Sequence, residues 1–583
     1  MLQTLLIWAV FAASLFPPSS QRCFKASESQ CQDVDFAPGS DLAGEGFDIT
    51  TMQRKGAFVL DMSTWLNKDK SCTLCKNPFM KGQTQKLPVS VVDWRPSQKC
   101  NMKLSSSVYQ SSEALVSSTT SSIENSWKSE LNVVIPKVQG SLMLAGSHSK
   151  LAEYSMDKSK KDKFSFASHA VSCGYYRFGI SSTPLLHPGL IKLFESLPNK
   201  YDESSKHLYY KLIDKFGTHY TTKVTLGGEV RSVTSIKECE ASLQGLSVDE
   251  VKMCLDMEAS VSKGPAANLM PELHHCKKDK ERNLNKKSFA SSFNDRDTNV
   301  IGGYTQSGDL LFSSNTDPKA YKEWVTSLPA HPDVISYSLE SIHNLLKTGK
   351  QTHLRNAIKD YILQRGLLKN CTSPCKTGMK TNSAKPCRCV CKNPLLSTDC
   401  CPTQKGFAEV TVTVIKATGL YGDYWDGTDG YVKLFLNGVF KDQTNTIMNN
   451  NNPYWNRNFN LGPMDLTMSH SVKLEVYDLD HGWDDDLLGA CTAELKSGVN
   501  KVCALNHGLL YYKVQVTCVP GLTGPSCSKY KPSPMDAQLE KVYVSRNARP
   551  IPTEMLLEMG VLLDERIPHF NQNNIRKNKG FEL

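Results

Sequence analysis

The stretch Tyr209–Gly228, which reads YYKLIDKFGTHYTTKVTLGG, decides how the larger part of this chain folds. Its first half has helical spacing, and the apolar face of the helix is formed by Leu208, Leu212, Ile213 and Phe216. Its second half alternates with the period of a β-strand, because Tyr220, Thr222, Val224 and Leu226 share one parity and Thr221, Lys223 and Thr225 the other. The sequence therefore predicts a helix that leads directly into a strand.

Two further features of this stretch concern function. The pair Gly227–Gly228 interrupts the predicted strand, where glycine usually marks a bend, a bulge or a close approach of two backbones. His219 invites an interpretation as a catalytic base. A lone histidine at a helix-to-strand junction is more often a structural hydrogen-bonding residue, so we assign no catalytic residue here.

The pattern Tyr-x6-Phe-Gly-Thr-His-Tyr, which starts at Tyr209, resembles the signature of the membrane-attack-complex/perforin (MACPF) family of pore-forming proteins. The resemblance implies an α+β fold with a bent antiparallel sheet, similar to that of the cholesterol-dependent cytolysins, and flanking helical clusters. It also implies that Gly227 and Gly228 form the hinge at which the sheet opens as subunits join. On this basis residues 21–369 are assigned to a MACPF domain.

Length, charge and the N-terminus limit the remaining possibilities. A chain of 583 residues fits about three or four domains. The net charge of +10 is small for this length, and we expect no nucleic-acid partner. Residues 5–16, LLIWAVFAASLF, are too few to span a bilayer and favour a secretory signal peptide, which we assign to residues 1–20.

The chain contains 20 cysteines, and an even number in a secreted chain favours disulfides. Cys72-x-x-Cys75 also has the spacing of half a zinc site, but secreted thiols rarely stay free, which favours disulfides. Asn370 begins the sequon Asn370-Cys371-Thr372 and is the predicted glycosylation site.

Two amphipathic segments, residues 141–180 and 247–293, flank the signature. In the first, Phe164 and Phe166 begin an alternating run, with Lys163 and His169 on the opposite, polar parity. The lysine-rich stretch Lys158–Lys163 before it suits a loop tip. In this segment a strand is the expected structure.

The second segment contains Glu250–Ser262, which alternates over the length that a membrane-spanning strand of a barrel requires. Its residues also fit helical spacing and mostly have good helix propensity, so the alternative is an ordinary amphipathic helix or edge strand in a soluble fold, which the segment without the signature would favour. The apolar residues of the alternation are Val251, Met253, Leu255, Met257, Ala259 and Val261.

Residues 318–369 are predicted to form helices, with Pro318 at a helix start and Leu339 in the buried stripe. The next segment, residues 370–402, contains seven cysteines and no hydrophobic run. It cannot bury a core and must be held by crosslinks, and it resembles an EGF-like module.

Carboxylates cluster after two predicted strands in residues 403–528. Such crowded carboxylates repel one another unless a cation neutralises them, and Ca²⁺ accepts six to eight oxygen ligands. Two acidic surface loops are the alternative, but the spacing resembles the calcium loops of an all-β C2-type sandwich. The resemblance implies a calcium site formed by Gly422, Asp423, Asp429, Asp478, Asp480, Asp485 and Asp486.

Four residues beside these aspartates suit a membrane interface, where an aromatic ring is partly buried and its polar edge stays wet. They are Tyr424, Trp425, His481 and Trp483. Once calcium cancels the acidic charge, the loops are expected to approach a phospholipid headgroup. The tail, residues 529–583, has no assigned function, and disorder is one interpretation of it.

The order of signal peptide, MACPF domain, EGF-like module and C2-type domain resembles the members of the family that cytotoxic lymphocytes secrete, as do NNNNP at Asn449–Pro453 and GWDDDLLG at Gly482–Gly489. The resemblance implies storage in cytolytic granules, calcium-dependent docking on target cells and assembly into homo-oligomeric rings. The two amphipathic segments would then convert into β-hairpins of a transmembrane barrel that acts in immune killing.

The resemblance also implies disulfide pairs, and Cys491–Cys503 and Cys518–Cys527 have the spacing of local crosslinks. The implied pairs are Cys23–Cys75, Cys31–Cys72, Cys100–Cys173, Cys239–Cys401, Cys254–Cys276, Cys371–Cys387, Cys375–Cys389 and Cys391–Cys400.

Two other classes of protein remain open. A secreted lipid-modifying enzyme would use the C2-type domain only for docking, but the chain has no Gly-x-Ser-x-Gly and no His-Glu-x-x-His motif, and we predict that it is not an enzyme. A non-lytic regulatory or adhesion protein would keep the fold without inserting.

Overall fold

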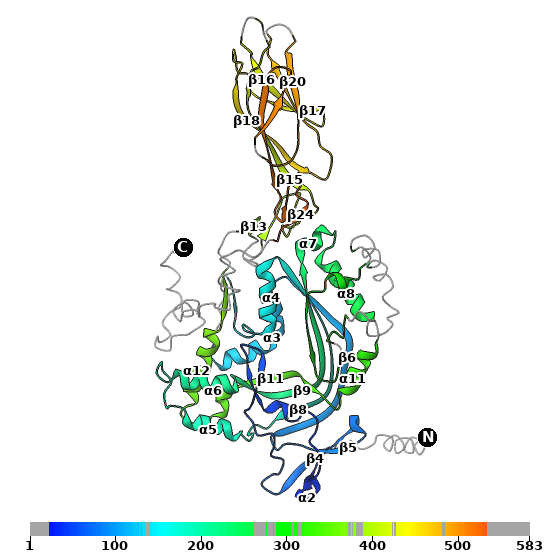
Figure 1. The fold of residues 1–583 in the computed structure, drawn as a ribbon. Coiled ribbons are helices and arrows are strands. Elements are labelled where there is room, and N and C mark those ends of the chain that lie inside the picture. The colour runs from blue at the N-terminus through cyan, green and yellow to red at the C-terminus, as the bar shows by residue number, and fades with distance from the viewer. Residues whose placement is uncertain are drawn as a thin grey trace, which may run out of the picture.

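The computed structural model describes residues 23–131, 133, 140–261, 276, 284, 287–305, 308–312, 318–370, 375, 377–380, 389–422, 424, 427–480, 484–498 and 500–532. These residues form an elongated molecule with a large mixed lobe and a β-sandwich lobe at one end (Figure 1). The predicted signal peptide and nearly all of the predicted tail lie outside the described residues.

The large lobe is built on an antiparallel sheet in which β9 (His219–Lys237) is central. Along one side, β9 pairs with β8 (Phe164–Ile180), which in turn pairs with β6 (Val91–Tyr109). The long strands bend partway along their length (Figure 1). The strands completing the sheet are β2 (Glu45–Asp48), β3 (Gln53–Phe58), β10 (Arg296–Ile301) and β11 (Asp333–Ser341).

The predicted helix and strand of the signature are confirmed. Helix α6 (Lys206–Phe216) ends at Gly217, whose φ is +82°, and β9 begins two residues later. The prediction for Leu208 was wrong, because this side chain is 39% exposed. In the first turn Tyr209 occupies the buried stripe instead, and its hydroxyl donates to the Pro198 carbonyl at 2.7 Å.

The strand does not stop at the glycine pair but continues through it. Gly227 lies opposite Gly174 of β8, and a Cβ atom on Gly227 would lie 1.9 Å from the carbonyl oxygen of Cys173. A Cβ atom on Gly228 would lie 2.3 Å from Leu328 and 2.6 Å from Trp324. The backbone of the adjacent strand therefore requires glycine at position 227, whereas side chains limit the space at position 228.

Two buried histidines near the start of β9 make the stability of this lobe depend on pH. His219 is fully buried, with Nδ1 2.7 Å from Oγ1 of Thr218. Burial lowers the pKa of His219 to about 3, and burial together with Arg355 lowers the pKa of His343 to about 4. Both side chains are neutral in the folded protein at pH 7, which agrees with a structural role for His219.

We expect His219 alone to cost the fold about 2 kcal/mol between pH 7 and pH 5. An unfolded histidine has a pKa of about 6.5, so the stabilisation is complete above that value and is lost as the pH falls toward the folded pKa. Urea unfolding in calcium-free buffer at both pH values measures the loss. His219→Gln should have a smaller pH dependence than the unaltered chain, and an equal dependence would contradict the assignment.

Helices cover the sheet around its long strands. Helices α3 (Ser112–Glu130) and α4 (Lys150–Lys161) lie on one side and α8 (Val248–Val261) on the other (Figure 1). The prediction of a loop tip at Lys158–Lys163 was wrong, because these lysines largely form the last turn of α4. Cations stabilise a helix C-terminus, and Lys158 also pairs with Asp295 at 2.6 Å.

Between 318 and 369 the all-helical prediction was partly wrong. Helices α11 (Pro318–Ser327) and α12 (Gln351–Gln364) form, but Leu339 lies in strand β11. Eight residues of β11 pair with β9, and Leu339 is buried between less buried neighbours. This segment carries a strand period of two as well as helical spacing, and pairing with β9 favours the strand.

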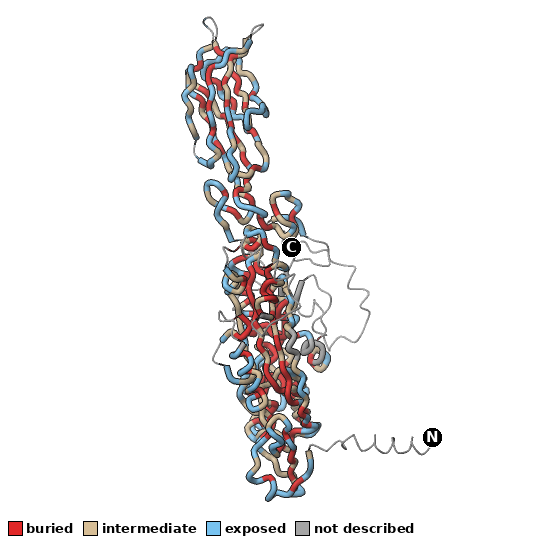
Figure 2. Tube along the Cα trace, turned by 90° about the vertical axis from the view of Figure 1, so that its right-hand side faces the viewer, coloured by how far each residue is buried: buried red, intermediate tan, exposed pale blue. Residues whose placement is uncertain are grey.

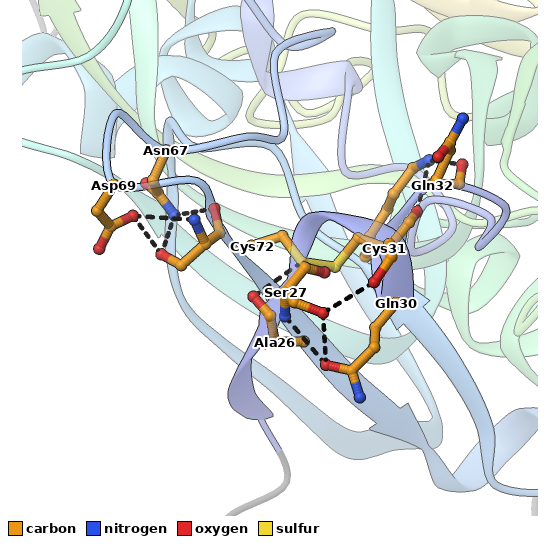
Figure 3. The surroundings of a disulfide bond; sticks show 11 residues. Ala26, Ser27, Gln30, Cys31, Gln32, Asn67, Asp69 and Cys72 are labelled. Atoms are coloured by element: carbon orange, nitrogen blue, oxygen red, sulfur yellow. Dashed lines mark hydrogen bonds between the residues drawn. A yellow bond between two sulfur atoms is a disulfide. The ribbon is translucent and has the colours of Figure 1, made fainter.

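Nine disulfides join described cysteines, and they connect the partners that the resemblance or the local spacing implied. Cys371 and Cys387 lie outside the described residues. The Cys31–Cys72 bond joins helix α2 (Glu28–Cys31) to β4 (Ser71–Asn77), beside a capping box in which Ser27 contacts Gln30 (Figure 3).

The C-terminal lobe consists of two antiparallel four-stranded sheets with an apolar core between them (Figure 2). Cys239–Cys401 ties the large lobe to the EGF-like segment that precedes this lobe, and the hydroxyl of Tyr530, which follows it, donates to Asp162 at 2.6 Å. One sheet contains β18 (Tyr454–Asp465), β15 (Phe407–Thr418), β22 (Leu509–Cys518) and β21 (Lys501–Ala504). The other contains β17 (Val439–Gln443), β16 (Gly430–Leu436), β19 (Val472–Asp478) and β20 (Asp486–Ala493).

Candidate metal and membrane-docking site

The strand register brings those predicted aspartates that the structure describes to one end of the β-sandwich. Gly430, the first residue of β16, lies opposite Asp478, the last residue of β19. Asp478 in turn lies opposite Asp486, the first residue of β20. Asp429 precedes β16 and Asp480 follows β19, so these carboxylates gather where the strands end.

Hydrogen bonds hold the carboxylate-bearing loops together. The backbone amide of Asp429 donates to Oδ1 of Asp478 at 2.6 Å, and Asp478 is only 1% exposed. The amide of Asp480 lies 3.4 Å from Oδ1 of Asp485. The Tyr431 hydroxyl donates to Asp485, and burial together with this contact raises the pKa of Tyr431. Backbone amides and a phenol are thus among the donors that hold these aspartates.

The residues present fit a hard cation. The donor set consists of carboxylate and carbonyl oxygens, which calcium prefers. Gly422 lies so close to Asp478 that a Cβ atom there would be 1.6 Å from Oδ2 of Asp478, so only glycine admits this approach. The described residues by themselves contain no group of three or more His, Cys, Asp or Glu side chains positioned to hold a metal, and Asp423 lies outside them.

The docking residues are only partly described. Tyr424 is 81% exposed, as a membrane-contacting side chain requires, whereas Trp425, His481 and Trp483 lie outside the described residues. Met448, which the sequence analysis did not single out, is 50% exposed at the same end and precedes the asparagine run.

The predicted membrane-insertion residues lie in the core of the large lobe. Segment 250–261 is helical in this conformation, as the second of the two alternatives predicted. Met253 is partly buried and the side chain of Val261 is not described. The buried members of the set are Val251, Leu255, Met257, Ala259, Phe164 and Phe166.

A polar contact that the sequence analysis missed connects α8 to the sheet. His169 was predicted on a polar strand face, but it is fully buried with Nε2 2.9 Å from Oδ1 of Asp256. Asp256 also accepts from Lys252 at 2.7 Å and from Ser106 at 3.0 Å. Burial raises the pKa of Asp256, but His169 and Lys252 outweigh it and the pKa lies below its usual value. Since α8 covers this face, the alternation of polarity does not predict burial here.

Asn370 ends strand β12 (Leu367–Asn370), and the rest of its sequon lies outside the described residues. Its glycosylation therefore stays a prediction. No helix in the described part of the chain is long and apolar enough to cross a membrane.

Three family models match the chain in the expected order. They are the MAC/Perforin domain over residues 36–371, the Perforin-1-like EGF domain over residues 370–403 and the C2 domain over residues 408–508. The C2 region is also similar to a Calcium-dependent lipid-binding protein of Arabidopsis thaliana, with 37% identity over 101 residues, which is 17% of this chain and 20% of that protein.

Similarity to two relatives extends along most of the chain. Perforin-1 of Rattus norvegicus is 38% identical over 523 residues, which cover 88% of this chain and 94% of that protein. Perforin-1 of Homo sapiens is 37% identical over 519 residues, which cover 88% of this chain and 93% of that protein. The matches of the family model and of these relatives establish that the chain belongs to the MAC/Perforin family.

Proposed function

We propose that this chain is a secreted, calcium-dependent pore-forming cytolytic protein that docks on target-cell membranes, oligomerises and inserts β-hairpins. The observation that carries the proposal is the combination of a MAC/Perforin domain, a Perforin-1-like EGF domain and a C2 domain in one chain. Two Perforin-1 relatives that match along 88% of the chain support the same function.

Calcium is the proposed cofactor of the C2 lobe. The side chains of Asp423, Asp429, Asp478, Asp480, Asp485 and Asp486 and the carbonyl of Gly422 would hold the ion. When bound, it would neutralise their charge and offer coordination to a lipid phosphate. The loops that carry the described aspartates lie at one end of the sandwich, and Tyr424 is exposed. Trp425, His481 and Trp483 are neighbours of the aspartates in the sequence. The printed name of the Arabidopsis relative, a calcium-dependent lipid-binding protein, supports this assignment.

Helix α8 is the proposed source of one inserted hairpin. It carries both a helical stripe and an alternating pattern, so the same residues can satisfy a soluble core and a membrane-spanning strand. In lipid every backbone donor and acceptor must be paired, which strands achieve only in a closed barrel. The segment that begins at Phe164 and Phe166 would supply the other hairpin.

Gly227 and Gly228 are the proposed hinge. The tight packing of Gly228 against Trp324 and Leu328 supports this role, because α11 and the loop after it would have to move away as the sheet opens. The proposed partners are the phospholipid membrane and further copies of the chain in a ring. Secretion from cytolytic granules completes the proposal, and a non-lytic MACPF protein or a lipid-modifying enzyme is the alternative.

Release of dyes of graded size from liposomes tests the function directly. Purified protein is added to phosphatidylcholine liposomes with calcium or with a chelator, and the released dyes and lipid products are measured. We expect calcium-dependent, size-limited release of intact dye. Binding without release would support the non-lytic alternative, and hydrolysed lipid without release would support the enzyme.

A further inference from the structure

We propose that the loop between β17 and β18, residues 444–453, is a third membrane-contacting loop, and that Met448 enters the bilayer from it. The inference rests on the proposed function and extends the docking surface beyond the two aspartate-bearing loops. The partner is a phospholipid bilayer. Three features of the loop carry the inference: where it is attached, what keeps it rigid, and the chemistry that it exposes.

Met448 is fixed between two attachments to the segment that contains Asp429. On one side, Ile447 and Gly430 exchange two backbone hydrogen bonds of 3.0 Å. On the other side, the amide of Asn449 donates to Oδ1 of Asp429 at 2.6 Å. Met448 therefore lies beside a proposed calcium ligand, at the end of the sandwich that is proposed to face the membrane.

The asparagine run forms a bracket that keeps this loop against the first aspartate loop. Oδ1 of Asn451 accepts from the amide of Thr428 at 2.9 Å, and Oδ1 of Asn452 accepts from the amide of Gly419 at 3.0 Å. Asn449 has a φ of +52°, a left-handed conformation that asparagine tolerates better than most residues. The run NNNNP thus acts as a structural element, with asparagine oxygens in place of a β-ladder.

The backbones of the two loops also approach closely. A Cβ atom on Gly427 would lie 2.7 Å from the carbonyl carbon of Asn449, so glycine permits this contact. The amide of Asn450 donates to the Thr428 carbonyl at 2.8 Å, and the amide of Leu420 donates to the Asn451 carbonyl at 2.9 Å. Movement of one loop toward a membrane would therefore bring the other with it.

The exposed chemistry of the loop suits lipid. Met448 is 50% exposed, and the nearby Tyr454, the first residue of β18, is 62% exposed. Residues 444–453 read TNTIMNNNNP and contain no charged side chain, unlike the aspartate loops beside them. The loop itself has no charge that a cation must neutralise before it approaches a bilayer. It reaches lipid once calcium has neutralised the aspartate loops beside it. A flexible apolar methionine adapts readily to such a surface.

The test compares Met448→Ser with Met468→Ser in the full-length protein. Met468 is a matched control, because it is 64% exposed and lies in the turn between β18 and β19 at the opposite end of the sandwich. Binding to phosphatidylcholine vesicles is measured in saturating calcium, and calcium affinity is measured calorimetrically without vesicles. We expect Met448→Ser to weaken vesicle binding about tenfold and Met468→Ser less than twofold. Met448→Leu should restore binding, and calcium affinity and thermal stability should not change.

The outcomes separate this inference from the function on which it rests. Unchanged vesicle binding of Met448→Ser, in a protein whose Asp429→Ala variant no longer binds, overturns the membrane contact but leaves calcium-dependent docking intact. A loss of calcium affinity in Met448→Ser also overturns it, because the residue would then act on the ion site. Normal vesicle binding with reduced dye release would assign Met448 to contacts between copies instead. Calcium-independent binding by Asp429→Ala would overturn the proposed docking mechanism itself.

Discussion

Asp429→Ala is expected to abolish calcium-dependent binding to liposomes at neutral pH, with a loss of affinity of at least about a hundredfold. The carboxylate has two roles at the end of the sandwich. It is a proposed calcium ligand, and its Oδ1 accepts the amide of Asn449 and thereby fixes the loop that carries Met448. Removing it takes away a negative oxygen donor and leaves a backbone donor without its partner, so both the ion site and the docking surface lose order.

A second substitution at this position separates the two roles. Asp429→Asn keeps an oxygen that accepts from Asn449 but removes the charge that calcium requires. We expect it to retain the thermal stability of the calcium-free protein and still to lose liposome binding. Asp442→Ala is the matched control, because Asp442 lies in β17, where it accepts from the amide of Gln443 at 2.8 Å and pairs with Arg457 at the surface at 3.1 Å. Unchanged calcium-dependent binding of Asp429→Ala would refute the ligand assignment.

Gly227→Ala is expected to destabilise the large lobe by roughly 4 kcal/mol or to prevent its secretion. The added Cβ atom would lie 1.9 Å from the Cys173 carbonyl oxygen, and this neighbour is backbone of the adjacent strand. It cannot rotate away as a side chain would, so β8 and β9 must separate at this position. Urea unfolding, or the yield of secreted protein if none folds, measures the effect.

The matched control for this prediction is Gly349→Ala, since a Cβ atom there meets no atom within 4 Å. Gly228→Ala should be intermediate, because the atoms that it would meet belong to the side chains of Trp324 and Leu328. Combining Gly228→Ala with Leu328→Ala tests this, since the shortened side chain should make the extra methyl group less costly. A stable, normally folded Gly227→Ala protein would show that the two strands are not packed as closely as described.

The sequence predicted the structure best where a local pattern is compatible with a single structure or a single kind of site. The change from helix to strand at Phe216–His219 depends on local spacing, and it was predicted because a period of 3.6 cannot also serve a strand over that length. The aspartates are similar, because carboxylates crowded at strand ends require either a cation or solvent. Their assignment to a C2-type lobe agrees with the matching family model, while their metal stays a proposal.

Other predictions failed because a pattern had two physical solutions or because burial came from a distant segment. Leu339 was assigned to a helix, but the open side of β9 accepted its segment as a strand. His169 was assigned to a polar face, but α8 covers it. Its contact, Asp256 of α8, lies 87 residues further along the chain. Met448 passed unnoticed because the bracket that fixes it joins loops more than 20 residues apart.

The sequence by itself determined the modules and the places where cysteines and carboxylates cluster, because helix signals, strand periods, cysteines and clustered carboxylates each act locally. Tertiary structure decided between the uses that a local pattern leaves open. It made residues 250–261 a helix, buried most of the apolar face of that helix, and turned the side chains of Asn451 and Asn452 into a bracket for a loop. The physical reason is that packing and hydrogen bonding between distant segments outweigh intrinsic preferences of a few tenths of a kcal/mol per residue.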